Sequence, residues 1–368
     1  MIASNVSLLH DADLSGGELP AARHFYISII VPVRNEARCI EQTLNCLVAQ
    51  RYDPRRFEIL VIDGQSTDAT RELVMAFARR HPNVRLLANP GRLSSAGRNV
   101  GVRHARGEII VLVDGHCELD DDRYLLSLAG AFQRSDADCV GRPQPLDVTG
   151  ASPLQQAIAA ARSSWLGHHP DSLIYCRQEG FVPAMSVAVA YRREVFDAVG
   201  LFDETFDACE DVELNYRVDR AGLRCYFTPS VAVRYRPRGT LAGLFRQLAR
   251  YGRGRVRLLR KHRDTLSLRT FVPLLFVVGL LAGLPLSAAV PWLRPLYFAA
   301  LMAYATIVGL SSLWIAAGKR QLALVAWLPL VSATIHIASG TGMLLELLCR
   351  PAAPTAPRRD LCDGNCAN

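Results

Sequence analysis

Three long apolar stretches in the last third of the chain limit its possible folds more than any other feature. Residues 270–293, 295–318 and 321–345 contain no Asp, Glu, Lys or Arg. Each stretch exceeds the roughly 20 residues that a helix needs to cross a bilayer. The sequence therefore predicts a membrane domain over 270–348 with about three transmembrane helices, followed by a flexible tail over 349–368.

Basic residues indicate how the chain is oriented in that membrane. Eight of them lie between Arg246 and Arg263, directly before the first apolar stretch, with no acidic residue among them. Cytoplasmic segments carry an excess of Lys and Arg, so we predict an inner (plasma) membrane protein with a cytoplasmic N-terminal domain. Residues 1–24 show no signal-peptide pattern and are predicted to be a flexible leader. Because the net charge of +8 is concentrated beside the membrane domain, it does not indicate nucleic acid as a partner.

The third apolar stretch permits two topologies. Three full crossings place the tail outside the cell, whereas Arg350, Arg358 and Arg359 favour a cytoplasmic tail. A segment that contains Pro329 and His336 can instead enter the membrane and return without crossing it.

Strand and helix patterns alternate between the leader and the basic segment. Apolar runs rich in β-branched residues predict buried strands at 26–33, 57–62, 84–87 and 109–113. Helical spacing of apolar residues fills the intervals. This alternation predicts an α/β domain over 25–239 with a mixed, mostly parallel sheet, whose functional loops meet at one edge. No phosphate-binding glycine fingerprint follows the first strand, which argues against dinucleotide oxidoreductases and phosphate-loop ATPases.

The strand at 109–113 runs directly into Asp114, Gly115 and His116. Ligands bind beyond the carboxyl ends of the strands in open α/β sheets, so Asp114 and His116 can face one metal ion or phosphate. A turn that only closes the strand is the alternative interpretation.

Two features of the second half of the domain extend this candidate site. Glu210 and Asp211 begin a predicted helix, where carboxylates favour the helix dipole whether or not they have another role. Residues 240–264 then predict a basic amphipathic helix with Leu244 and Leu248 on one side, a pattern typical of helices that lie in the membrane interface.

Six motifs occur in order along residues 27–255. They are Pro32-Val33-Arg34-Asn35-Glu36, Asp63 with Ser66-Thr67-Asp68, Arg98-Asn99-Val100-Gly101, Asp114-Gly115-His116, Glu210-Asp211 and Gln247-Leu248-Ala249-Arg250-Tyr251. Together they resemble the inverting family 2 glycosyltransferases of the GT-A fold. Two departures stand out: His116 takes the place of the last Asp of the family's Asp-x-Asp, and Tyr251 replaces the Trp of Gln-x-x-Arg-Trp.

The resemblance implies a role for each motif. The nucleotide-sugar donor would be bound by Pro32, Glu36, Asp63, Arg98 and Asp114. A divalent metal, Mg²⁺ or Mn²⁺, would be held by Asp114 and His116. Because imidazole also suits softer divalent ions, the identity of the metal stays open.

The resemblance also assigns the acid–base chemistry and the acceptor side. Asp211, with Glu210 beside it, matches the family's base, which takes the proton of the acceptor hydroxyl as that oxygen attacks the anomeric carbon. The acceptor and the diphosphate would meet Gln247, Arg250 and Tyr251. We further expect the other cations of the basic helix to face lipid phosphates, namely Arg253, Arg257, Arg260 and Lys261.

The resulting hypothesis is a membrane-bound transferase that moves a sugar, from a UDP-sugar in the first instance, to a lipid-linked acceptor. The pattern is similar to that of succinoglycan-type exopolysaccharide glycosyltransferases, which implies exopolysaccharide or glycolipid synthesis. Two alternatives are transfer to a polyprenyl phosphate, as in relatives of dolichyl-phosphate mannose synthase, and a non-catalytic nucleotide-sugar-binding scaffold. The presence of both Asp114 and Asp211 argues against the scaffold. The sequence does not define the sugar, the linkage or the oligomeric state.

Overall fold

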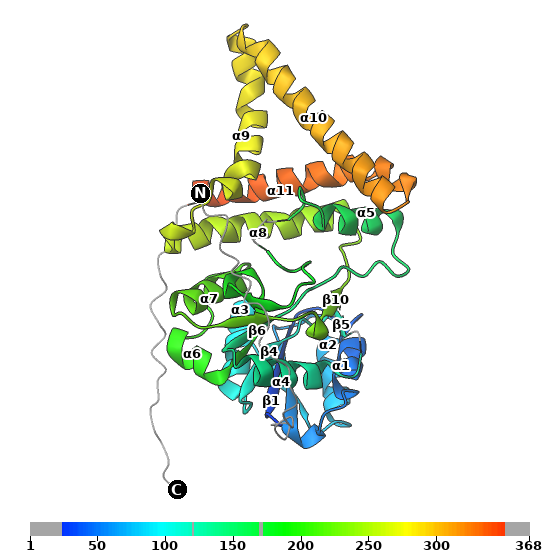
Figure 1. Ribbon diagram of the computed structural model, residues 1–368, viewed down its shortest axis with the longest axis vertical. Helices are drawn as coiled ribbons and strands as arrows, with labels where there is room; N and C mark the ends of the chain where they lie inside the picture. The colour runs from blue at the N-terminus through cyan, green and yellow to red at the C-terminus, as the bar shows by residue number, and fades with distance from the viewer. Residues whose placement is uncertain (1–23, 120, 169–171, 350–368) are drawn as a thin grey trace, which may run out of the picture.

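Apolar strands alternate with helices in the first part of the chain, as predicted. The computed structural model of the protein describes residues 24–119, 121–168 and 172–349 (Figure 1), so nearly all of the predicted leader and tail lies outside the described residues. The alternating elements are β1 (Ile27–Val33), α1 (Ile40–Val48), β2 (Phe57–Asp63), α2 (Thr70–Ala78), β3 (Val84–Ala88), α3 (Ser94–His104) and β4 (Ile109–Leu112).

The second half of the domain completes the sheet. It contributes α4 (Tyr124–Ser135), β6 (Cys139–Gly141), α5 (Pro153–Arg162), β7 (Gly180–Val182), β8 (Ala188–Arg192), α6 (Arg193–Val199), α7 (Glu210–Arg220) and β9 (Cys225–Phe227). Among the described residues the strand order is β3-β2-β1-β4-β8-β6-β9-β7. The strands from β3 to β4 are parallel, whereas β8 is antiparallel to both of its neighbours. The predicted α/β class with a mixed sheet is therefore confirmed.

A small second sheet connects the end of the domain to the candidate site. It pairs β5 (Cys117–Leu119), which follows the Asp114–His116 loop, with β10 (Val233–Tyr235), which precedes the basic helix. This antiparallel pairing places Tyr235 opposite Cys117. The chain consequently enters the basic helix from a point next to the predicted metal loop.

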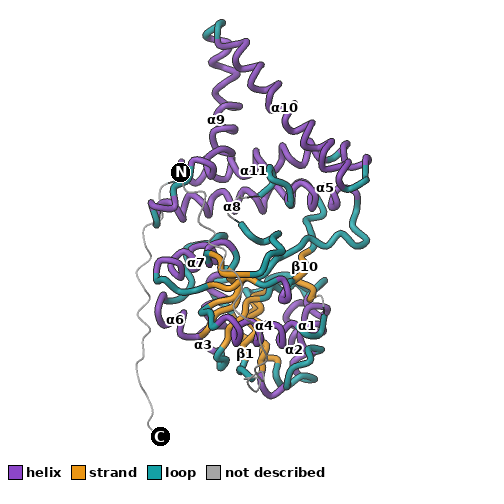
Figure 2. The backbone as a smooth tube through the Cα atoms, in the orientation of Figure 1, coloured by secondary structure: helices purple, strands orange, loops and turns teal. Residues whose placement is uncertain are grey.

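The last part of the described chain, from Leu241 onward, consists of helices joined by short loops and contains no strand (Figure 2). It comprises α8 (Leu241–Lys261), α9 (Leu268–Ala289), α10 (Leu293–Gly318), the short 3₁₀ helix η5 (Leu322–Ala326) and α11 (Leu328–Leu348). By length and composition α9, α10 and α11 could each cross a membrane. Figure 1 shows that α9 and α10 form a hairpin that stands away from the sheet domain, whereas α11 lies beside α8.

Buried apolar side chains hold these parts together. Two clusters pack against the two faces of the sheet, and a third joins α5 to the C-terminal helices. In the third cluster Ile158 of α5 is fully buried with Leu244 of α8 and Val331 of α11. Although α5 lies within residues 25–239 of the sequence, it packs against α8 and α11. We refer to α5, α8 and α11 together as the helical layer.

Candidate active site

The ends of β1, β2 and β4 meet at one edge of the sheet, where the donor-binding residues are predicted. Asp63 ends β2, is almost completely buried, and accepts a hydrogen bond from the backbone N–H of Ser66 at 3.2 Å. Pro32 lies in the neighbouring strand, opposite Ile62. A side chain at Gly115 would come within 2.6 Å of Val33, so glycine lets the loop after β4 lie directly against the end of β1.

Close packing of these two loops brings Glu36 to His116. The Nδ1 atom of His116 lies 3.0 Å from Oε1 of Glu36, while its Nε2 atom is buried and has no hydrogen-bond partner. The ring edge of His116 also contacts Tyr235, with 5.0 Å between the ring centroids. Burial opposes the charged imidazole, but the hydrogen bond to Glu36 and the charge of Asp114 together raise the pKa of His116 above its usual value. Glu36 thus orients His116.

The arrangement fits a metal ion that is shared with a bound diphosphate. Within the described parts of the chain, no group of three or more His, Cys, Asp or Glu side chains is placed to hold a metal. Asp114 and the free Nε2 of His116 would supply two ligands, and phosphate oxygens can complete the shell of a cation held jointly with its substrate. The hydrogen bond of Glu36 to the opposite ring nitrogen is the usual support of a metal-binding histidine.

Arg98 connects this metal loop to the start of α7. Its Nη1 atom lies 3.0 Å from Oε1 of Glu210, and its Nη2 atom lies 3.7 Å from Oδ1 of Asp114. The side chain is nearly buried, and burial disfavours its charge, but the two carboxylates raise the pKa of Arg98 above its usual value. The positive charge of Arg98 therefore lies between Asp114, the predicted metal ligand, and Glu210, the neighbour of the predicted catalytic base Asp211.

The two carboxylates at the start of α7 have different surroundings. Glu210 is buried against Arg98, and burial raises its pKa despite the opposing charge of Arg98. Asp211 is partly exposed and lines a cavity of about 160 Å³. Only Asp211 of the pair lines this cavity, so it is the carboxylate available to a substrate.

Two arginines that the sequence did not single out as site residues line the same cavity. Arg142 follows β6, donates from Nη2 to the carbonyl oxygen of Leu112 at 3.0 Å, and is 6% exposed. Its Nη1 atom is buried without a hydrogen-bond partner. Arg255 of α8 lines the cavity as well. A three-residue strand before Arg142 is too short to show a period, so no sequence pattern indicated this residue.

The predicted acceptor motif on α8 lies beside the metal loop. Gln247 is buried, and its Nε2 atom lies 3.3 Å from the hydroxyl oxygens of both Tyr235 and Tyr251. Tyr235 in turn contacts the ring of His116, so it links Gln247 to the predicted metal ligand. Arg250 instead donates to the backbone carbonyl of Asp207 at 2.5 Å, which ties α8 to the loop before α7.

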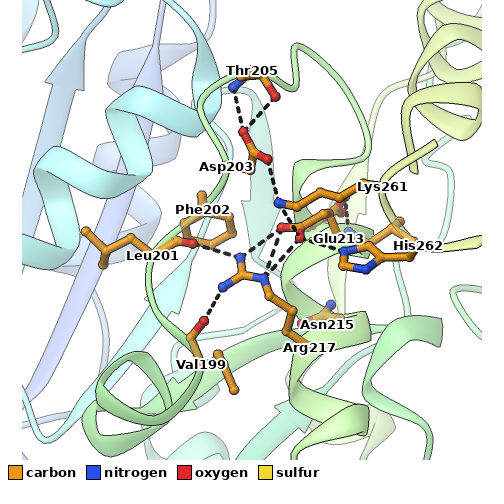
Figure 3. Close-up of polar contacts among 12 residues, drawn as sticks. Val199, Leu201, Phe202, Asp203, Thr205, Glu213, Asn215, Arg217, Lys261 and His262 are labelled. Carbon is orange, nitrogen blue, oxygen red and sulfur yellow. Dashed lines mark hydrogen bonds and ion pairs between the residues drawn. The ribbon is translucent and has the colours of Figure 1, made fainter. Parts of the chain in front are cut away.

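The other cations of α8 pair with acidic side chains of the protein, so the expectation that they face lipid phosphates is wrong. Glu346 of α11 lies within 4 Å of three of them, Arg253, Arg257 and Arg260. Lys261 lies 2.5 Å from Asp203 and 2.8 Å from Glu213. Figure 3 shows that Arg217 and His262 also contact the Glu213 carboxylate. These contacts join α7 to the end of α8.

A second, larger cavity lies between one part of the sheet domain and the helices α5 and η5. It measures about 900 Å³ and is bordered by Pro145, by Ala159 of α5 and by Leu324 of η5. The cations Arg177 and Lys319 line it, and the described residues of its lining include no acidic side chain. Ile174 borders both cavities, so the larger one adjoins the space beside Asp211.

Comparisons with known proteins identify the class that this fold and site define. Residues 28–200 match the family model for glycosyl transferase family 2, and a relative similar along nearly its whole length supports the match. The chain belongs to this family and has its GT-A fold.

The particular relatives are as follows. The chain is 33% identical over 335 residues to the succinoglycan biosynthesis protein ExoA of Rhizobium meliloti, covering 87% of this chain and 94% of that protein. It is 25% identical over 243 residues to a dolichyl N-acetyl-α-D-glucosaminyl phosphate 3-β-D-2,3-diacetamido-2,3-dideoxy-β-D-glucuronosyltransferase of Methanococcus voltae, covering 64% and 74% of the two chains. A mannosyltransferase of Pyrobaculum calidifontis, solved with GDP-mannose and Mn²⁺, shares the fold at 23% identity with a TM-score of 0.54 over 87% of each chain.

Proposed function

We propose that this glycosyltransferase inverts the donor sugar, depends on a divalent metal, and transfers the sugar from a nucleotide donor, in the first instance a UDP-sugar, to a lipid-linked acceptor. The reaction takes place at the cytoplasmic face of the plasma membrane and serves exopolysaccharide or glycolipid synthesis. One observation carries the proposal: Asp211 lines a cavity and directly follows Glu210, which pairs with Arg98 beside Asp114, in a chain that also has three membrane-type helices.

The residues divide the reaction between them. Asp211 accepts the proton of the acceptor hydroxyl while that oxygen forms a bond to the anomeric carbon. The bond from that carbon to the diphosphate breaks on the opposite side, so the configuration inverts and the electron pair leaves with the nucleoside diphosphate. Arg98 stabilises the developing negative charge, and Glu210 holds Arg98 in place. A divalent ion on Asp114 and His116 would supply further positive charge to the diphosphate.

Charge and cavity shape support a lipid-linked acceptor. Arg142 offers an unpartnered buried N–H group and Arg255 a second cation beside Asp211, a combination suited to an acceptor phosphate. The larger cavity continues from there toward η5 and the end of α10, at the membrane side of the domain. The relative from Methanococcus voltae carries a name that describes a dolichyl-linked acceptor, which agrees with this chemistry.

The cytoplasmic orientation is supported by the position of the basic residues. Arg263, Lys319 and Arg320 follow or precede the membrane-type helices on the side of the sheet domain, whereas Arg294 lies at the far end of the α9–α10 hairpin. Loops rich in Lys and Arg remain in the cytoplasm.

A screen of radiolabelled UDP-sugars and GDP-sugars with native lipid extract tests the proposal. The purified chain should move one label into the organic phase. Mass spectrometry of that product separates an extended lipid-linked saccharide from a sugar on a bare polyprenyl phosphate, the second acceptor class that Arg142 and Arg255 would suit. If a donor binds calorimetrically yet no label is transferred to any lipid, the chain acts as a scaffold and the proposal fails.

A further inference from the structure

The third membrane-type helix, α11, is oriented differently from the other two. α9 and α10 rise from the helical layer as a hairpin, while α11 runs alongside α8 and between α8 and that hairpin (Figure 1). Leu244 near the start of α8 shares a buried cluster with Val331 near the start of α11, and Arg260 near the end of α8 contacts the carbonyl oxygen of Leu347 near the end of α11, so α8 and α11 are parallel.

Glycines make this contact a backbone-to-backbone one. A Cβ atom on Gly252 of α8 would lie 2.2 Å from the carbonyl oxygen of Ser339. A Cβ atom on Gly342 of α11 would lie 2.0 Å from the carbonyl oxygen of Ala249. Neither position tolerates a side chain without a backbone shift, so the two helices are tightly apposed where they meet.

An ion-pair cluster fixes the end of α11 to α8. Glu346 is 6% exposed and lies 2.9 Å from Nε of Arg257 and 3.2 Å from Nε of Arg253. Its backbone carbonyl accepts a hydrogen bond from Arg260 at 2.9 Å. Moving α11 away from α8 would separate the buried Glu346 carboxylate from its three partly exposed arginine partners, which opposes that movement.

The middle of α11 contacts backbone that is not helical. His336 contacts the carbonyl oxygen of Leu166, in the irregular segment after α5, at 3.0 Å. A Cβ atom on Gly340 would lie 2.0 Å from the carbonyl oxygen of Pro273, in the second turn of α9. Irregular backbone is excluded from the lipid-exposed hydrocarbon core, so the midpoint of α11 is near the membrane surface.

A crossing α11 would also require its parallel partner to cross. α8 carries seven basic residues within its 21 residues, and each Arg or Lys at a bilayer centre costs about 2.5–3.5 kcal/mol. Asp203 and Asp207 of the sheet domain, which pair with Lys261 and Arg257, would have to enter the hydrocarbon core as well. α8 therefore stays outside the hydrocarbon core, and α11 stays with it.

We infer that α11 lies in the plane of the membrane surface, with lipid headgroups and upper acyl chains as its partner. Its apolar side chains cover α8 and α5 on one side, and exposed Leu330 and Leu345 enter the lipid on the other. The α9–α10 hairpin is then the part of the described chain that crosses the bilayer. The sheet domain and the end of α11 at Leu348 then lie on the same side of the membrane, which agrees with the basic residues that follow Leu348 in the sequence.

Two measurements on the full-length chain in membranes test this topology. Epitope tags at the N-terminus, at the C-terminus and after Pro291 are exposed to protease in right-side-out and in inverted vesicles. The inference requires that the two terminal tags be cut in the same vesicles and the Pro291 tag in the other kind. A C-terminal tag that behaves like the Pro291 tag would overturn it.

Depth measurements provide the second, independent readout. A nitroxide is attached through a keto-bearing unnatural amino acid at position 330 or 345, which leaves the native cysteines unlabelled, and its depth is read from oxygen and nickel-chelate accessibility. An in-plane α11 gives the same depth at both positions within a few Å. A crossing helix separates them by about 22 Å, because α-helices rise about 1.5 Å per residue, and that result would refute the inference.

Discussion

Replacing Glu213 with alanine is expected to loosen the joint between the catalytic helix α7 and the basic helix α8. Glu213 has no exposed surface and lies within 3.0 Å of Arg217, Lys261 and His262 (Figure 3). It lies in α7, three residues after Glu210 and two after Asp211. The substitution removes the shared partner of two cations, Arg217 and Lys261, and of the His262 ring, and so destabilises the sheet domain and the position of Asp211.

The expected loss in the free energy of unfolding depends on the contacts that Arg217 and Lys261 keep after the substitution. Removal of one member of a buried ion pair costs about 3–5 kcal/mol. Arg217 keeps the carbonyl oxygens of Val199 and Leu201, and Lys261 keeps Asp203, so we expect a loss of about 3 kcal/mol. In a domain of this size, that loss lowers the melting temperature by about 6–12 °C.

Thermal unfolding in detergent, followed by circular dichroism, measures this shift, with Glu213→Gln as the matched control that keeps the shape but loses the charge. Burial alone would raise the pKa of Glu213, but hydrogen bonds from Arg217, Lys261 and His262 lower it below its usual value. The stabilisation from the charge is therefore complete above the usual glutamate pKa and disappears as the pH falls through the lowered folded-state pKa. Equal melting temperatures of wild type and Glu213→Ala at pH 7 would refute the reasoning.

Two further substitutions test the site itself. His116→Ala should weaken Mn²⁺-dependent donor binding by at least about tenfold in calorimetry, because one ligand is lost, whereas His116→Asp should retain it; equal affinity of His116→Ala and wild type would exclude His116 as a ligand. Arg142→Gln should raise the KM for the lipid acceptor about 10–100-fold and leave donor affinity unchanged, because a charged hydrogen bond contributes about 1.5–3 kcal/mol; a matching loss of donor affinity would place Arg142 on the donor instead.

The first half of the fold was predictable because its strands are long, apolar and buried on both faces. β1, β2 and β4 carry that pattern and lie where it predicts them, within two residues. The strands β5, β6, β7 and β10 have only three residues each, which is too few for any period to appear. Helix α5 was not predicted. It is rich in alanine, and its packing partners in α8 and α11 are more than eighty residues away in the sequence.

The motif residues were predictable individually, but their contacts were not. The sequence singles out Glu36 and His116, yet only the tertiary fold shows that one orients the other. The arginines of α8 illustrate the same limit. Their run of positive charge is typical of a lipid-facing helix, and the single carboxylate that neutralises three of them lies more than eighty residues further along the chain.

The assignment of Asp211 as the base is the central claim, and Asp211→Asn tests it most directly. The variant keeps the size and polarity of the side chain at the cavity but cannot accept the proton. We predict unchanged donor affinity by calorimetry and a loss of sugar transfer of about 10²–10⁴-fold, the range for removal of a general base. Transfer at the wild-type rate would contradict the assignment and with it the mechanism.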